Sequence, residues 1–525
     1  MEKHNIMKTF ISLFALLLSL SITAQTNPAT WYLNDTSGSG IQSPTNTASG
    51  NYSVAMGENS IASGLYSLGF GVQTNASGYA AIAIGRASTA SGESATSIGH
   101  QTTASGNFSI AMGENSTASE LYSMSFGVQT DASAYAALAM GRASTASGES
   151  ATSIGHQTTA SGNFSIAMGE NSTASELYSM SFGVQTDASA YAALATGRAT
   201  SASGNSSVSL NYLTSASGNY SIAMGESTTA SGETATAMGY RSIASGDYSV
   251  AIGYGSLEEG SFSTGTPYYR NEAIGIRSHV IGNRNKSTGS KSFSIGNDNL
   301  SKGTGAFSIG ENNISTGDYS MAIGLFSESV AYGSFSFGNN AYADGYNTTA
   351  IGSANTVDDS AIADQWNQNN RAFVIGNGFY DIDNAQLTRS DAFTVWFNGD
   401  ATLAGNLNVN SDARLKANII SLGGTLAKLL QIDGKKYTIK RDESQKENIG
   451  LLAQDIEKVF PELVSESNGI KSVNYQGLVP VLINALKEQD VMMKEQQRIL
   501  SEQQSELDEL KSMMKKIKEV YFRDL

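Results

Sequence analysis

Ser411 and Lys416 lie five residues apart at a point where the composition of the chain changes. A serine hydroxyl attacks a carbonyl carbon when a base removes its proton, and a lysine amine can act as that base when burial favours its neutral form. Such a pair could cut a peptide bond once. Five residues along an α-helix correspond to a rotation of about 140°, so the two side chains cannot meet on one regular helix. We therefore expect a turn between them, or a partner residue from another subunit.

Spacing alone favours a simpler interpretation. Ser411 could cap the start of a helix, and Lys416 could be a solvated side chain.

Other residues with chemical potential are better explained structurally. His100 and His156 occupy the same place in a repeat, about 19 Å apart, so one chain cannot bring them together as a metal pair. Asp381, Asp383 and Asn384 fit a turn rich in Asp and Asn better than a calcium loop. We expect no metal and no cofactor.

The composition excludes several classes of protein. The 525 residues include 54 glycines and no cysteine, and only 15% are charged. The absence of cysteine excludes a disulfide framework. Residues 411–525 hold 18 basic and 18 acidic residues, so the whole net charge of -15 lies upstream. A nucleic-acid partner is therefore not expected.

A fourteen-residue period organises most of the chain. The first phase of closing residues is Gly57, Gly71, Gly85, Gly99, Gly113, Gly127, Gly141, Gly155, Gly169, Gly183, Gly197, Asn211, Gly225, Gly239 and Gly253. The period resumes one residue out of phase from Gly282 to Gly352. Each unit carries two turns and two short strands, which predicts a parallel β-roll, or solenoid, of 14-residue coils.

Alternate residues within each strand differ in size. Tyr52, Val54 and Met56 point to one face of the strand, and Ser53 and Ala55 point to the other. We expect the bulky face to fill the coil and the small face to pack against identical chains.

The rest of the chain divides as follows. Residues 1–24 have a secretory signal pattern, and 25–44 form a linker. The roll occupies 45–355 and an irregular β neck occupies 356–410. The remainder is an α+β domain (411–480), with a helix expected over 415–430, that ends in a coiled coil (481–525). No stretch is long and apolar enough for a membrane helix, so we expect no integral membrane segment.

Two resemblances add to this interpretation. The sequences from Asn51 to Gly57, Asn219 to Gly225 and Asp247 to Gly253, each after Ala-Ser-Gly, resemble the head repeats of YadA-type trimeric autotransporter adhesins. That family implies a homotrimer of left-handed β-rolls, located at a bacterial surface or secreted, which binds an extracellular protein or glycan. Those adhesins end in a membrane β-barrel anchor, which this sequence does not display.

Residues 411–525 resemble the C-terminal intramolecular chaperone of endosialidases and phage tailspikes (serine peptidase family 74). The similarity rests on Ser411 to Ile419, Gly450 to Gln454, Phe460 to Val464 and Ser472 to Tyr475. It implies that the domain trimerises a fibre and then releases itself by cutting the Asn410–Ser411 bond. Ser411 would be the nucleophile and Lys416 its partner, acting once in cis or within the trimer, with no turnover activity in the head. The alternative is a polysaccharide-degrading solenoid enzyme with the same chaperone.

Overall fold

The computed structural model describes residues 32–33, 41–42, 44–255, 270–440 and 445–522. The chain separates into two compact units, Met1–Ala404 and Gly405–Leu525, which we call the roll unit and the C-terminal unit. The expected signal peptide over 1–24 lies outside the described residues, as does most of the linker.

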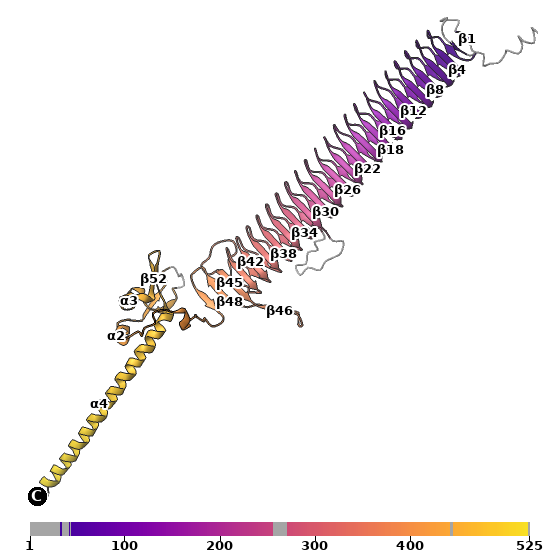
Figure 1. Ribbon diagram of the computed structural model, residues 1–525. Helices are drawn as coiled ribbons and strands as arrows, with labels where there is room; N and C mark the ends of the chain where they lie inside the picture. Colours follow the sequence, from indigo (N-terminus) through magenta and orange to yellow (C-terminus); the bar gives the residue numbers. More distant parts are fainter. Residues whose placement is uncertain (1–31, 34–40, 43, 256–269, 441–444, 523–525) are drawn as a thin grey trace, which may run out of the picture. The chain divides into compact units, whose positions relative to one another are not determined.

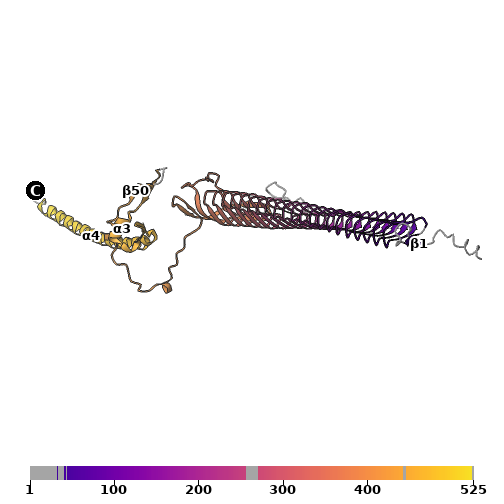
Figure 2. The same cartoon turned by 90° about the horizontal axis from the view of Figure 1, so that it is seen from above.

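The roll unit is a stack of narrow coils along one axis (Figures 1 and 2). Each coil contributes a five-residue strand and a short strand of two or three residues, so the two strands are unequal. Five-residue strands pair in parallel and in register, as Gly113 does with Gly127 and Gly127 with Gly141. The predicted parallel roll of fourteen-residue coils is confirmed.

The five-residue strands are β4 (Val54–Glu58), β6 (Leu68–Val72), β8 (Ile82–Arg86), β10 (Thr96–His100), β12 (Ile110–Glu114), β14 (Met124–Val128), β16 (Leu138–Arg142), β18 (Thr152–His156), β20 (Ile166–Glu170), β22 (Met180–Val184), β24 (Leu194–Arg198), β26 (Val208–Tyr212), β28 (Ile222–Glu226), β30 (Thr236–Tyr240), β32 (Val250–Tyr254), β34 (His279–Asn283), β36 (Phe293–Asn297), β38 (Phe307–Glu311), β40 (Met321–Leu325), β42 (Phe335–Asn339) and β44 (Thr349–Ser353). The short strands are β3 (Thr47–Ala48), β5 (Ile61–Ala62), β7 (Asn75–Ala76), β9 (Thr89–Ala90), β11 (Thr103–Ala104), β13 (Thr117–Ala118), β15 (Asp131–Ala132), β17 (Thr145–Ala146), β19 (Thr159–Ala160), β21 (Thr173–Ala174), β23 (Asp187–Ala188), β25 (Ser201–Ala202), β27 (Ser215–Ala216), β29 (Thr229–Ala230), β31 (Ser242–Ala244), β33 (Asn271–Ala273), β35 (Lys286–Ser287), β37 (Leu300–Ser301), β39 (Ile314–Ser315), β41 (Glu328–Ser329) and β43 (Tyr342–Ala343). Strands β1 (Tyr32–Leu33) and β2 (Ile41–Gln42) precede the stack.

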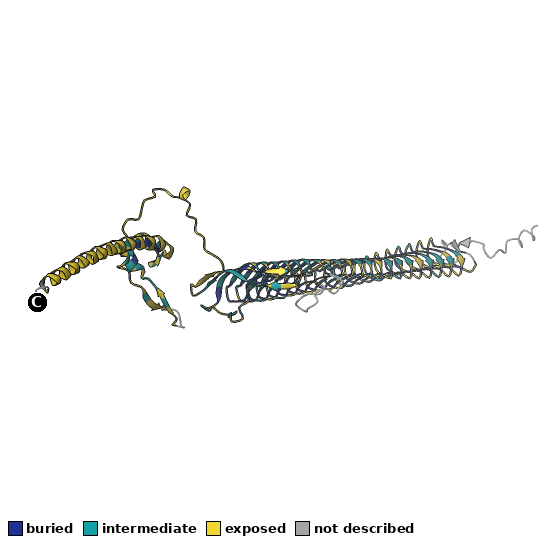
Figure 3. Ribbon diagram, turned by 90° about the horizontal axis from the view of Figure 1, so that it is seen from below, coloured by how far each residue is buried: buried dark blue, intermediate teal, exposed yellow. Residues whose placement is uncertain are grey.

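The coil interior is filled by the small residues, which corrects our expectation about the two strand faces. Ala55, Ala111 and Ala139 are fully buried, whereas Met112 and Met140 remain 37% and 39% exposed. Figure 3 shows buried and less buried residues mixed along every coil of the stack. A coil of fourteen residues encloses one thin layer of side chains, so most of the residues within it are Ala, Ser, Thr or Asn, and Val280 is one of the few larger ones. The bulky face therefore lies outside the coil.

Buried polar side chains bond from one coil to the next. Thr130 Oγ1 donates to Ser116 Oγ at 2.9 Å, and Ser116 Oγ donates to the carbonyl oxygen of Gly127 at 2.8 Å. Nearer the C-terminal end, Asn285 Nδ2 donates to the carbonyl oxygen of Gly296 at 2.7 Å. Asn299 makes the equivalent bond one coil later. These bonds satisfy polar groups that would otherwise destabilise a dry interior.

The periodic glycines are required by both conformation and space. Gly113 has φ +124°, and a Cβ on it would lie 1.9 Å from the carbonyl oxygen of Gly127. Asn211 stands in the series with φ +90°, the substitution that tolerates positive φ best.

The phase change does not interrupt the stack. Strand β32 pairs in register with β34, so Gly253 lies beside Gly282 although they are 29 residues apart. The shift of phase thus reflects additional residues between two consecutive coils.

The roll continues past residue 355 before it ends. Strand β45 (Arg371–Asn377) stacks in parallel on β44, and β48 (Asp391–Trp396) and β49 (Ala401–Leu403) follow antiparallel. An Asn-Gly turn joins β48 to β49, with Gly399 at φ +96°. A hairpin of β46 (Phe379–Asp381) and β47 (Gln386–Thr388) branches from this end.

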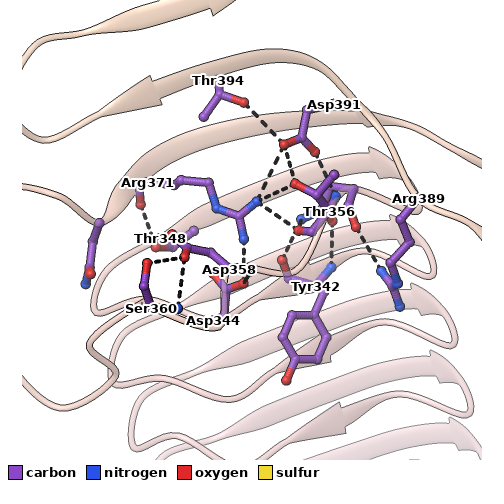
Figure 4. A network of polar contacts seen from close by, with 12 residues as sticks. Tyr342, Asp344, Thr348, Thr356, Asp358, Ser360, Arg371, Arg389, Asp391 and Thr394 are labelled. Atoms are coloured by element: carbon purple, nitrogen blue, oxygen red, sulfur yellow. Dashed lines mark hydrogen bonds and ion pairs between the residues drawn. The ribbon is translucent and has the colours of Figure 1, made fainter.

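A buried polar network closes this end of the roll (Figure 4). Arg371 is 3% exposed and forms ion pairs with Asp344 and, at 3.6 Å, with Asp391. Its Nη1 also donates to the carbonyl oxygen of Thr356 at 2.8 Å. The next strand, β48, pairs antiparallel with β45, so the parallel stack ends here.

The C-terminal unit is a small α+β assembly on a long helix. Its elements are η1 (Ala413–Leu415), α2 (Leu426–Leu429), β50 (Lys435–Thr438), β51 (Glu447–Gly450), α3 (Ala453–Val459), η2 (Pro461–Leu463), β52 (Val464–Ser467), β53 (Ile470–Val473), η3 (Tyr475–Gly477) and α4 (Leu478–Tyr521). Its core contains Ile456, Phe460, Leu463, Leu478 and Val481. In the described part of the chain, no helix is long and apolar enough to cross a membrane.

The expected helix over 415–430 is wrong. Only α2 is α-helical there, and Lys416 has the extended dihedrals φ -117° and ψ 147°. Gly423, with φ +67°, and Gly424 directly precede α2. Two adjacent glycines weaken a helix interior by about 1 kcal/mol each, which accounts for the break.

The coil interior makes a direct prediction. Replacing Ala139 with isoleucine should lower the free energy of unfolding by about 1–3 kcal/mol, because the extra methyl groups overpack the coil. The change is read by urea unfolding and by hydrogen exchange in β14 and β18. Met140→Ile, one residue away on the outer face, is the matched control and should change stability little. Equal effects of the two substitutions would contradict the assignment of faces.

Candidate active site

Residues 411–416 form one tight turn. Asp412 caps η1, and its carboxylate accepts a hydrogen bond from the Arg414 amide at 2.8 Å. Arg414 Nη2 forms an ion pair with the same carboxylate at 2.6 Å. The hydrogen bonds from the Arg414 side chain and amide lower the pKa of Asp412. The turn is thus held by residues lying between the two candidate catalytic groups.

This turn brings Ser411 and Lys416 together. Lys416 Nζ donates a hydrogen bond to Ser411 Oγ at 2.6 Å. The two residues flank a single 3₁₀ turn with extended backbone at Lys416, so they avoid the separation that an α-helix would impose. The structure places the pair within one chain, and Asn410 precedes it as an exposed residue.

The contact is exposed in the single chain. Both Ser411 and Lys416 are open to solvent. A lysine removes a proton only in its neutral form, which burial favours. The geometry of a serine–lysine pair is therefore present, whereas the dry surroundings that activate such a pair are not supplied by one chain.

Hydrogen bonds connect the segment after the turn to α4. The Thr425 amide donates to Glu488 Oε1 at 2.5 Å, and the Leu426 amide donates to Glu488 Oε2 at 3.2 Å. Thr425 is 2% exposed, and its hydroxyl donates to the carbonyl oxygen of Val481 at 3.1 Å. The hydrogen bonds that Glu488 accepts lower its pKa, and the bond from the Thr425 amide contributes most. Sequence reasoning missed Glu488, because no local pattern links positions 63 residues apart.

The other candidates behave as structural residues. His100 and His156 each lie beside a glutamate of the next coil, at 3.8 and 3.9 Å. Asp381 accepts from the Asp383 amide at 3.0 Å and from Asn384 Nδ2 at 2.8 Å, as expected for an Asx-type turn. Among the residues that the structure describes, no cluster of three or more His, Asp or Glu side chains is arranged to hold a metal ion.

Two families match this chain. The family described as the YadA head domain repeat (2 copies) matches residues 48–68, 62–88, 76–102, 90–116, 104–130, 132–158, 146–172, 160–186, 216–242, 230–256, 301–327 and 329–355. The family described as the chaperone of endosialidase matches residues 411–465. The second match begins at Ser411, the first residue of the turn.

Two phage proteins are similar over part of the chain. The long tail fiber protein Gp37 of Salmonella phage S16 is 30% identical over 152 residues, which is 25% of this chain and 20% of that protein. The protein of the same name from Escherichia phage AR1 is 26% identical over 133 residues, which is 22% of this chain and 12% of that protein. The chain thus matches a fifth or less of the length of these relatives.

The chain joins a stack of coils that matches the YadA head domain repeat to a C-terminal segment that matches the chaperone of endosialidase.

Proposed function

We propose that this protein is a homotrimeric fibre, secreted or held at a bacterial surface, that binds an extracellular protein or glycan. Its C-terminal unit directs trimer assembly and then cuts itself off between Asn410 and Ser411. The observation that carries the proposal is the Ser411–Lys416 contact, at the start of the segment that matches the chaperone of endosialidase. The YadA head repeats and the tail fibre relatives support the fibre.

The outer face of the roll supports assembly into trimers. Large apolar residues recur there in successive coils, and Phe70, Met140 and Phe337 are 49%, 39% and 51% exposed. An apolar surface of this length is typical of a buried interface. A second and third copy of the chain would cover it.

The long helix α4 supports the same conclusion. Residues spaced alternately four and three apart run along α4 from Leu482 to Ile517, the pattern that a coiled coil buries. Among them, Leu486, Leu500 and Met514 are 67%, 64% and 62% exposed, and Figure 3 shows α4 exposed over most of its length. Three parallel copies of α4 would remove this surface from water and bring three C-terminal units together.

The proposed reaction uses only groups of this turn and water. Ser411 Oγ attacks the carbonyl carbon of Asn410, and Lys416 takes the hydroxyl proton. The bond between that carbon and the Ser411 nitrogen breaks as Lys416 returns the proton to the nitrogen. An ester then joins Asn410 to Ser411 Oγ. Water hydrolyses it, leaving a carboxylate on Asn410 and a free amino group on Ser411.

Assembly would control this reaction through burial. In the single chain the pair is open to water. Packing of three C-terminal units around α4 would remove water from the turn and favour the neutral amine. Cleavage would then follow trimerisation and leave unassembled chains whole.

The catalytic roles are tested by conservative substitutions. Ser411→Ala should leave the chain uncut, and Lys416→Arg should slow cleavage by about 100-fold or more, because arginine stays protonated. Ser421→Ala is the matched control within the same exposed segment. Denaturing gels measure cleavage, and light scattering measures the trimer. Normal cleavage of Ser411→Ala would refute the proposed nucleophile.

Glu488 is proposed as the positioning residue that links the turn to α4. Glu488→Ala should leave trimers intact and slow cleavage about tenfold, because the segment after the turn loses its bonds to α4. Glu509→Ala, farther along α4, is the control and should cleave normally. The pKa of Glu488 is lowered in the folded chain. Its charged form therefore stabilises the fold at neutral pH, and this stabilisation is lost as the pH falls through the lowered pKa. Cleavage of Glu488→Ala at the normal rate would show that the link has no such role.

A further inference from the structure

The turn edge of the roll carries aromatic residues in groups of three. We call Tyr52, Tyr66 and Tyr79 the first triad, Phe108, Tyr122 and Tyr135 the second, and Phe164, Tyr178 and Tyr191 the third. The first two rings of each triad stack, with centroids 5.2, 5.4 and 5.5 Å apart. The third ring stands across the stack at 88°, 81° and 82°. The rings are 44–63% exposed.

In the coil that follows each triad, no aromatic ring stands at this turn position. Ser94, Ser150 and Ser206 occupy the turn position there, and we call these positions the serine breaks. Ser94 has φ +53° and Phe108, one coil later, has φ +56°, so the two side chains leave the backbone in the same geometry. Phe108 stacks on Tyr122 on its other side. Its face toward Ser94 is therefore not covered by a ring of the adjacent coil.

Polar groups surround each break. Glu93, Glu149 and Asn205 directly precede the serines and are exposed. The hydroxyl of Tyr79, Tyr135 or Tyr191 comes from the coil before. Each break thus combines an open aromatic face with hydrogen-bonding groups, and it recurs every 56 residues, or about 19 Å for four coils.

We propose that the three serine breaks are equivalent binding sites for a neutral polysaccharide. The weakly positive C–H groups of a sugar ring pack on the electron-rich face of Phe108, Phe164 or Tyr220. The neighbouring carboxylate or amide accepts hydrogen bonds from sugar hydroxyls. The inference rests on the proposed fibre function and names its ligand and binding sites.

The charge, composition and spacing of the turn edge favour a neutral polysaccharide over other ligands. The acidic excess upstream of residue 411 repels polyanions such as acidic polysaccharides. A second copy of the chain fits the continuous apolar strand face better, because interface cores are depleted of glutamate and the breaks carry Glu93 and Glu149. Regular spacing suits a polymer, which can occupy several breaks at once and gains affinity by doing so.

The test compares the wild-type fibre with variants that carry an aromatic ring at each serine break. The wild-type fibre is incubated with an immobilised β-glucan, α-mannan and galactan, with alginate as the polyanion and gelatin as the protein. We expect saturable binding to at least one neutral polymer and none to alginate. The combined Ser94→Phe, Ser150→Phe and Ser206→Phe variant should lose at least tenfold in affinity, because each new ring covers the open face. The matched Ser→Ala triple variant should bind as the wild type does.

Trimer mass and cleavage are measured on the same samples, which separates this inference from the proposed function. A wild-type fibre that trimerises and cleaves but binds no neutral polymer would overturn the inference alone, as would binding to gelatin only or an undiminished Ser→Phe variant. Loss of trimers in the Ser→Phe variant, with trimers kept in the Ser→Ala variant, would instead assign this edge to contacts between copies.

Discussion

The narrowness of the fourteen-residue coil governs the rest of this structure. A coil that encloses one thin layer accepts Ala111, Ser116 and Ala118 inside and sends Met112 outward. Backbone hydrogen bonds between coils and rows of buried hydroxyl and amide groups hold the stack together. Little apolar area is buried within one chain, so this interior supplies less hydrophobic stabilisation than an ordinary core. The outer face is left with the large apolar side chains, and identical chains are the proposed means of covering them.

The C-terminal unit also leaves large apolar side chains exposed, in this case along a helix. Its small core around Ile456 is closed, but α4 exposes its apolar seam over many turns. Ser411 and Lys416 already touch in one chain, and both are exposed to solvent. Assembly of identical chains would therefore cover the exposed apolar surfaces of both units. Glu488 and Val481 both lie on α4 and both accept hydrogen bonds from Thr425, so α4 is bonded to the segment that follows the turn.

Sequence reasoning predicted the repeat, the register and the closing turns because glycine at positive φ leaves an unambiguous mark. It assigned the two strand faces the wrong way round, since alternation states only that the faces differ and not which one is enclosed. It extended a helix over 415–430, where Gly423 and Gly424 prevent one. At the candidate site it predicted the pair and the need for a turn between Ser411 and Lys416. It could not find Glu488, whose contact with Thr425 exists only in the folded chain.

The most direct measurement is mass spectrometry of the purified wild-type chain under native and denaturing conditions. We expect a complex of three fibre fragments that end at Asn410, together with a fragment whose first residue is Ser411. We also expect chains that remain monomeric to be intact. Whole chains within a stable trimer, or fragments arising from monomers, would contradict the claim that assembly activates the cut.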